Sequence, residues 1–390
     1  MRNRLLVSIL GRIAGALCQI ALLAQVAKVL SPVEFGIFSV SVSACWVLNT
    51  PLDFGMGTAV LRGMNEHLAR RSLTTFASIR VFVTLSVILV LLVLSHGGAL
   101  DFVSVFAVVY TLGESAGDLA VGIFQGLKES NKATILLITR RLSALLPFVF
   151  LANDAPYFWS TLTAGLVGFV AFLYLAIRIG ARPISPMALI RRNIQFMFSS
   201  SATNVAQFDT SLVGVAGGLQ LAGVYGGVTR LLNPLNILIS TALQIVIPEM
   251  TQAKGYTERL SIFRKIRTYT LFLSLALLSL SFVSPWVVSL LLGPNFKDSA
   301  SIAVAICVAA ALSAVSQIHL AWFYATHVRA AISGVMWSGV ILGLASILTL
   351  TFILGLTGAS IGLVLMQCAI CVGLVHAWIQ DTKEIRDDDA

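Results

Sequence analysis

Charge is scarce in this chain. Of its 390 residues only 11% are Asp, Glu, Lys or Arg, whereas 57% are hydrophobic. A soluble globular domain carries about a quarter charged residues, so the composition excludes that class. It favours instead an all-α integral membrane protein that crosses the bilayer many times, because a helix is the segment that satisfies its own backbone in lipid.

Cysteine is scarce as well. The five cysteines all lie in apolar stretches, which excludes a disulfide framework. Cys368 and Cys371 form a C-x-x-C pair, but no second pair and no nearby histidine completes a metal site. We therefore expect no metal site. We also expect no bound cofactor and no catalytic residue, and we predict that the protein is not an enzyme.

Long apolar runs are what the sequence has in abundance. About 20 apolar residues are needed to cross the hydrocarbon core. On that scale we predict twelve spans, at residues 5–28, 35–58, 75–95, 102–126, 133–152, 157–178, 194–217, 222–247, 269–292, 301–325, 330–354 and 358–379. The first follows Arg2 and Arg4 as a signal peptide would, but it is long and lacks a cleavage site, so we expect it to stay attached.

The basic residues between the spans indicate the orientation. Almost all of them fall on one side, and only Lys28 and Lys297 lie on the other. By the positive-inside rule both termini are predicted to be cytoplasmic. The net charge of +9 then reflects contact with anionic headgroups of membrane lipids, and no nucleic-acid partner is expected.

The chain also divides near its midpoint. A basic segment with two prolines separates six predicted spans from six more, and Gly36-Ile37-Phe38 is echoed by Gly223-Val224-Tyr225, 187 positions later. We predict a first lobe at residues 1–180, a cytoplasmic linker at 181–193, a second lobe at 194–380 and a cytoplasmic tail at 381–390. The lobes would be parallel repeats, a common transporter plan.

Ionisable residues inside the predicted spans are the chemically informative ones. Each costs about 3 kcal/mol on insertion scales, so each needs a partner or a water-filled cavity. They are Arg12, Arg80, Glu114, Asp118, Arg140, Arg141, Asp209 and Arg230. Asp53 and His319 lie near cytoplasmic ends of their spans, where a side chain can reach the interface.

Two interpretations of these charges stay open. In one, Asp118–Arg140 and Asp209–Arg230 are ion pairs that fix helix register, and Glu114 shares a helix face with Asp118. In the other, the arginines line a cavity and bind an anion. Five arginines against three acids favour the anion, and phosphate suits a guanidinium fork.

Asn233 and Pro234 lie three and four residues after Arg230. A proline frees a backbone carbonyl one turn upstream, and broken helices at cavities expose polar backbone at membrane depth. We therefore predict Arg12, Arg140, Arg230 and Asn233 as substrate-binding residues. Glu114, Asp118 and Asp209 are predicted as ion-pair or coupling residues, the coupling ion being H⁺ or Na⁺.

Several short motifs resemble a known family. Residues 30–38 read LSPVEFGIF, residues 52–57 read LDFGMG and are followed by Arg62, and residues 247–250 read IPEM. Together with Asp209, Asn233-Pro234-Leu235 and the LGPNF at residues 292–296, they resemble the Wzx-type polysaccharide flippases. These belong to the multidrug/oligosaccharidyl-lipid/polysaccharide (MOP) exporter superfamily.

The resemblance implies both a fold and an activity. It implies two six-helix bundles around a central cavity, in the bacterial inner membrane. It also implies alternating access, which moves a polyprenyl-diphosphate-linked oligosaccharide from the cytoplasmic to the outer leaflet for O-antigen, capsule or exopolysaccharide. The partners so implied are the lipid-linked oligosaccharide and, beside it, glycosyltransferases and a polysaccharide polymerase.

Two rivals come from other classes. A MATE-like exporter of drugs or other small molecules would share the fold, but it would bind organic cations, which the arginine surplus disfavours. A membrane glycosyltransferase or polymerase needs catalytic groups and usually a sizeable external loop, and the predicted external loops are all short.

The predicted topology has a direct test. Reporter fusions after residues 98, 155, 220, 295 and 356 should report the outside, and fusions after 66, 130, 186, 258 and 328 the cytoplasm, because the basic loops stay inside. An inversion in the middle of this series would contradict the two-lobe arrangement.

Overall fold

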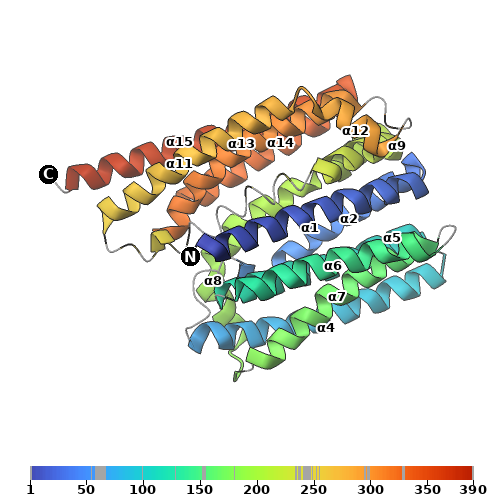
Figure 1. The fold of residues 1–390 in the computed structure, drawn as a ribbon, viewed down its shortest axis with the longest axis horizontal. Coiled ribbons are helices and arrows are strands. Elements are labelled where there is room, and N and C mark those ends of the chain that lie inside the picture. Colours follow the sequence, from blue (N-terminus) through green and yellow to red (C-terminus); the bar gives the residue numbers. More distant parts are fainter. Residues whose placement is uncertain are drawn as a thin grey trace.

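The computed structural model is a long bundle of helices that lie roughly along one direction (Figure 1). It describes residues 2–53, 55–57, 67–98, 100–127, 129–151, 155–179, 181–232, 255–293, 299–326 and 330–388, with positions 235, 239, 247, 249–251, 253 and 296. Every regular element in this part of the chain is helical, which confirms the predicted all-α fold class.

The helices of the amino-terminal half are α1 (Arg2–Val29), α2 (Pro32–Asp53), α4 (His67–His96), α5 (Phe102–Gly126), α6 (Ser130–Phe150) and α7 (Ala155–Ile179). Those of the carboxy-terminal half are α8 (Pro186–Val205), the 3₁₀ turn η1 (Ala206–Phe208), α9 (Asp209–Leu232), α11 (Tyr256–Leu280), α12 (Ser284–Leu292), α13 (Ala300–Ala325), α14 (Ala330–Leu354) and α15 (Leu356–Asp388).

These helices account for the predicted spans. Within the described residues, nine helices are long and apolar enough to cross a membrane, and α11 with α12 makes a tenth across a bend of 63°. The apolar part of α1, Ile13–Val29, is shorter. One of the nine, Ser201–Leu232, contains the break at Gly218 and so holds two predicted spans. The predicted span at 222–247 is described continuously only as far as Leu232.

Gly218 is where the chain turns between the seventh and eighth spans. Its φ of 85° and ψ of 170° interrupt helix α9. A positive φ is readily adopted only by glycine, which has no Cβ to clash with the backbone. The turn falls one residue before the predicted external loop at 219–221.

Several helices extend beyond the predicted spans into the basic connections. Helix α4 includes Arg70 and Arg71, α11 begins at Tyr256, and α8 begins at Pro186. Its start is capped by Ser185, whose hydroxyl accepts from the backbone N–H of Ala188. Of the predicted linker, only residues 181–185 are non-helical. They are held on α4, where the Thr75 hydroxyl accepts from the Ile184 N–H at 2.8 Å.

The helices form two groups that meet through α2 and α9 (Figure 1). In the first group α5 packs on α7, and α6 packs on both α1 and α7. In the second, α15 packs on α13 and α14, and α11 packs on α13. Chain order therefore matches position in space, and the fold is two helix bundles joined side by side.

The contact between α2 and α9 depends on two glycines. A Cβ on Gly36 would overlap with the carbonyl oxygen of Leu219, and a Cβ on Gly223 would overlap with that of Pro32. Each carbonyl lies four residues before the glycine of its own helix, so the contact is reciprocal. The sequence echo between these two segments is thus a packing device that brings two backbones together.

Aromatic rings extend this contact. Phe35 meets Phe38 and Phe296 edge-on, with ring centroids 5.6 and 6.1 Å apart, and Phe38 meets Tyr157 at 6.0 Å. All four are buried. Because Phe296 belongs to the second group and Tyr157 to the first, the two bundles are in direct contact at the end predicted to be external.

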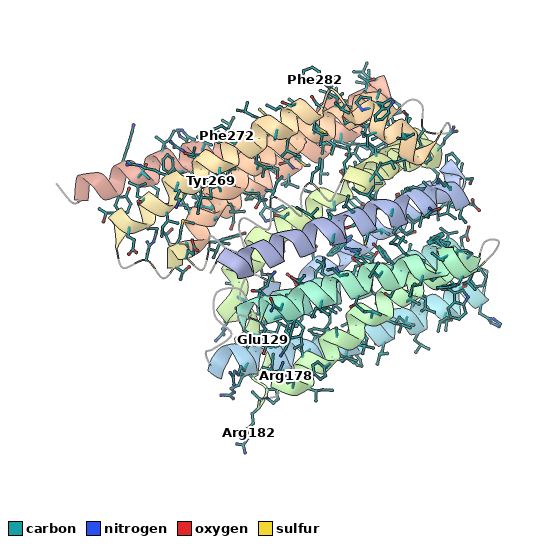
Figure 2. All side chains as sticks on the ribbon, viewed as in Figure 1. Glu129, Arg178, Arg182, Tyr269, Phe272 and Phe282 are labelled. Atoms are coloured by element: carbon teal, nitrogen blue, oxygen red, sulfur yellow. The ribbon has the colours of Figure 1, made fainter. Side chains whose placement is uncertain are left out.

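The end of the molecule away from this aromatic contact has charged side chains, whereas the outer face of α11 is apolar (Figure 2). Glu129 accepts from Arg178 at one end of the first bundle and also pairs with Lys132. Hydrogen bonds from Lys132 and Arg178 lower the pKa of Glu129. Tyr269 and Phe272 of α11, with Phe282 beyond its end, are exposed on the outer face, as expected of a surface in contact with lipid tails.

The glycine contact predicts an asymmetric response to alanine. Gly36→Ala should lower the free energy of unfolding by about 1–3 kcal/mol, because the added methyl group forces α2 away from α9. Gly122→Ala is the matched control, since a Cβ there meets nothing within 4 Å. Detergent-solubilised variants compared by fluorescence thermal unfolding check this, and equal stability of the two would contradict the proposed packing.

Candidate functional site

A buried network of charges connects α5 and α6. The guanidinium of Arg140 is 0% exposed and lies 2.6 Å from the Asp118 carboxylate and 3.3 Å from that of Glu114. Arg141 contacts the other Glu114 oxygen at 2.7 Å. Gly117 makes the room, because a Cβ there would overlap with the Arg140 guanidinium. The predicted Asp118–Arg140 ion pair is therefore present, and Glu114 belongs to it.

The members of this network differ in exposure. The Glu114 side chain is 6% exposed, whereas that of Asp118 is 55% exposed. Arg140 also donates to the Glu114 carbonyl at 3.1 Å, so it is enclosed by its own bundle. A guanidinium held in this way has a structural partner on each side, and this geometry favours the ion-pair interpretation for Arg140 over substrate binding.

A second polar cluster lies between α2, α4 and α5. Arg80 donates to the Ser115 hydroxyl at 2.5 Å, and the Asn49 amide donates to the same oxygen at 2.9 Å. Asp53 of α2 attracts Arg80 electrostatically. Asp53 was predicted to lie near the interface, and its side chain is only partly buried. Arg80 was predicted inside its span, and it is 3% exposed.

The expected arginine surplus can be compared with the described side chains. Of the ionisable residues that the sequence places inside or near the ends of the spans, the described cations are Arg80, Arg140, Arg141 and Arg230, and the described acids are Asp53, Glu114, Asp118 and Asp209. These are four charges of each sign. The fourth acid is Asp53, whose partly buried side chain lines the cavity described below. The side chain of Arg12, which was part of the surplus, lies outside the described residues.

Asp209 and Arg230 lie close together but do not form the predicted ion pair. Asp209 accepts from the Tyr225 hydroxyl at 2.8 Å and from the Thr210 hydroxyl at 3.0 Å. Arg230 instead donates across the bundle contact to the Ser39 carbonyl at 2.8 Å and lies over the Phe38 ring at 5.6 Å. In the described structure, no carboxylate oxygen comes within 4.0 Å of its guanidinium.

Both residues line one cavity of about 510 Å³ in the second bundle. Its walls are η1 and the helices α8, α9, α13, α14 and α15, and Asp53 enters from α2. From Asp209 and Arg230 it continues to Asp53 and Tyr324, near the ends of α2 and α13 on the predicted cytoplasmic side. The cavity begins below the closed contact of α2 and α9.

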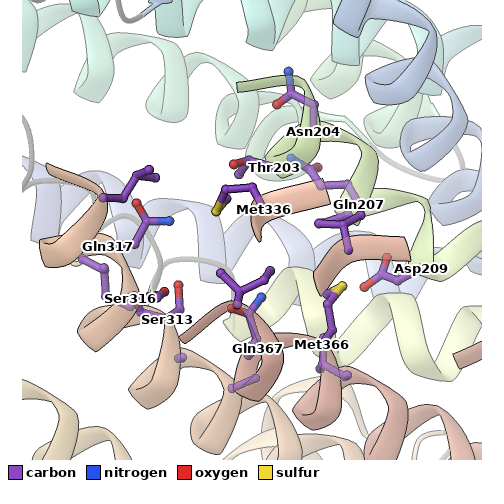
Figure 3. Close-up of a pocket in the computed structure, with 18 of the residues that line it drawn as sticks. Thr203, Asn204, Gln207, Asp209, Ser313, Ser316, Gln317, Met336, Met366 and Gln367 are labelled. Atoms are coloured by element: carbon purple, nitrogen blue, oxygen red, sulfur yellow. Dashed lines mark hydrogen bonds between the residues drawn. The ribbon is translucent and has the colours of Figure 1, made fainter. Parts of the chain in front are cut away.

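Neutral polar side chains dominate the polar part of the lining. Figure 3 shows Asn204 and Gln207 on one wall and Ser313, Ser316, Gln317 and Gln367 on the other. None of these residues was predicted from the sequence, although amides in α13 and α15, two otherwise apolar spans, are a detectable signal. Asn233, predicted for this site, and Pro234 lie outside the described residues.

The fold defines the class of protein. A MATE in complex with MaL6 has a TM-score of 0.66 at 14% identity over 97% of this chain and 96% of that one. An outward-facing multidrug resistance MATE family transporter of the MOP superfamily has a TM-score of 0.63 at 13% identity over 97% and 96%. The fold is therefore that of the MOP superfamily transporters.

A third structure is a MOP superfamily transporter from Pyrococcus furiosus, for which a reversed polarity of the binding pocket suggests a different function. Its TM-score is 0.60 at 13% identity over 96% of each chain. Residues 2–254 match the family described as polysaccharide biosynthesis protein, so the chain belongs to that family. Among curated proteins nothing matches. The predicted Wzx-type resemblance and the predicted multi-pass membrane protein are both confirmed.

The charge network predicts unequal effects of two neutralised acids. Glu114→Gln leaves Arg140 and Arg141 buried with too little negative charge, and should cost about 3–5 kcal/mol of stability. Asp118→Asn, whose carboxylate is half exposed, should cost less. Thermal unfolding of the two purified variants compares them. A larger loss for Asp118→Asn would show that Glu114 is not the centre of the network.

Proposed function

We propose that the protein translocates a polyprenyl-diphosphate-linked oligosaccharide from the cytoplasmic to the outer leaflet of the bacterial inner membrane. The observation that carries this proposal is the cavity of about 510 Å³ with walls of amides and hydroxyls. A cavity of that volume lies within the range that holds drug-sized ligands, and its lining offers hydrogen bonds to sugar hydroxyls. The polysaccharide biosynthesis family membership supports the same substrate class.

The charges of the cavity suit the lipid-linked headgroup. Arg230 is the cation among the described lining residues, and a guanidinium fork can hold phosphate through two parallel hydrogen bonds. The polyprenyl tail stays in the bilayer while the sugars and the diphosphate pass between the bundles. In this proposal Arg12 and Asn233 contribute to the same passage, and Arg140 holds the first bundle rigid.

Alternating access follows from the position of the closed contact. The bundles meet at Gly36 and Gly223, and the cavity extends from there toward the predicted cytoplasmic side. This arrangement corresponds to an inward-facing state. Opening to the outer leaflet requires α2 and α9 to separate and the Arg230–Ser39 hydrogen bonds to break. Asp118 and Asp209 are the acids we propose for coupling to H⁺ or Na⁺.

A MATE-like exporter of organic cations is the second candidate. Two carboxylates, Asp53 and Asp209, line the cavity against one guanidinium, and this observation favours a cation. Cation sites also use aromatic faces, yet Tyr324 is the single aromatic residue in the described lining. The neutral amide walls therefore favour the lipid-linked sugar, with glycosyltransferases supplying it and a polymerase consuming it.

Reconstitution into liposomes tests the proposal. Purified protein should move a polyprenyl-diphosphate-linked oligosaccharide to the opposite leaflet, measured by its accessibility to an impermeant oxidant. Arg230→Ala should slow this at least tenfold, and Arg230→Lys should retain little, because lysine lacks the paired fork. Arg182→Ala, an exposed arginine on the surface, is the control.

The double variant Asp209→Ala/Arg230→Ala adds a second readout. Since no ion pair joins these two side chains in the described structure, the double variant should be as slow as Arg230→Ala. Recovery of flipping would assign Arg230 a purely structural role. Efflux of an organic cation without any movement of the lipid-linked sugar would favour the MATE-like exporter instead.

A further inference from the structure

Among its described lining residues the cavity has one cation, Arg230, and no second guanidinium or ammonium for another anionic group. Within its described lining Arg230 faces two acids, Asp53 and Asp209. Arg80 of α4 is 3% exposed and is not among the described lining residues. In the sequence, residues 233–246 contain no charged residue. A diphosphate bound to Arg230 would therefore occupy the one cation of the described lining, and a second anionic group would have none.

The remaining polar lining is matched to neutral sugars. Asn204, Gln207, Gln317 and Gln367 each carry an amide that both donates and accepts, and the hydroxyls of Ser313 and Ser316 do the same. Sugar hydroxyls also donate and accept, so they can pair with either half of an amide. A carboxylate can only accept hydrogen bonds. Its transfer from water into the protein costs much free energy unless a charged donor pairs with it.

We propose that this cavity is the subsite for the glycan and that it selects oligosaccharides made of uncharged sugars over those that carry a carboxylate. The inference rests on the proposed function, and it adds the charge class of the substrate. A glycan carboxylate would lose its hydration, find no cation of its own, and approach the carboxylate oxygens of Asp209. The repulsion between these two negative charges disfavours binding of the acidic glycan.

Two lipid-linked trisaccharides that differ at one sugar test the selection. One consists of neutral hexoses, and in the other a hexuronic acid replaces one hexose, on the same polyprenyl diphosphate. In proteoliposomes we expect the wild-type protein to flip the neutral compound at least tenfold faster. Gln317→Lys places an ammonium in the cavity wall, and it should raise the rate for the acidic compound at least threefold relative to the neutral one.

Gln317→Met is the matched control for that variant. It removes the same amide at similar length without adding charge, so it should leave the ratio of the two rates as in the wild type. A gain of activity on the acidic substrate also cannot arise from misfolding.

The outcomes separate the two proposals. Equal or faster flipping of the acidic compound by the wild type overturns the selection while flippase activity stands. A tenfold preference that Gln317→Lys leaves unchanged overturns the placement of the glycan in this cavity. Movement of neither compound overturns the proposed function itself.

Discussion

The close approach of α2 and α9 at Gly36 and Gly223 is the contact on which the remaining arrangement depends. Two helix backbones can meet because neither glycine has a Cβ, and the bulky rings of Phe35, Phe38 and Phe296 then pack around the contact. The contact closes one end of the space between the bundles. It thereby defines the direction in which the cavity of the second bundle extends, and the proposed alternating access starts from this closed contact.

Buried charge is compensated within the first bundle. Glu114 and Asp118 form ion pairs with Arg140 and Arg141 inside the first bundle, and these residues thereby join helices α5 and α6. Breaking one partner of such a network is far more costly than its net contribution to stability. The first bundle is therefore suited to move as one body, while Arg230 of the second makes its hydrogen bonds across the contact between them.

The two bundles consequently have different chemistry. The first contains a closed set of ion pairs, and the second contains a cavity with amide and hydroxyl walls. A substrate with a charged diphosphate and a hydroxyl-rich glycan can be matched to Arg230 and to the neutral walls of one cavity. This division also explains why total intramembrane charge is a poor guide to the substrate: Glu114, Asp118, Arg140 and Arg141 are already paired with one another.

Much of the fold could be predicted from the amino-acid sequence. Apolar runs of helical length determined the all-α class and the approximate spans, because a bilayer admits few other solutions. The repeated glycine segments indicated two halves, and the i, i+4 spacing of Glu114 and Asp118 indicated a shared face. These are local properties of the chain, and local periodicity suffices to read them.

Only the tertiary structure decided which charges meet. Asp53 was predicted to lie near the interface, but in the structure it lines the cavity, while Arg80 is buried and donates to Ser115 of α5. Packing also places Asp209 so that it accepts a hydrogen bond from Tyr225, and Arg230 so that it donates to Ser39. The predicted Asp209–Arg230 ion pair therefore does not form. The amides of the cavity come from α8, η1, α13 and α15. Their spacing along the chain does not indicate that they line the same cavity. Partner choice depends on distances between helices, which the sequence sets only through the complete packing of both bundles.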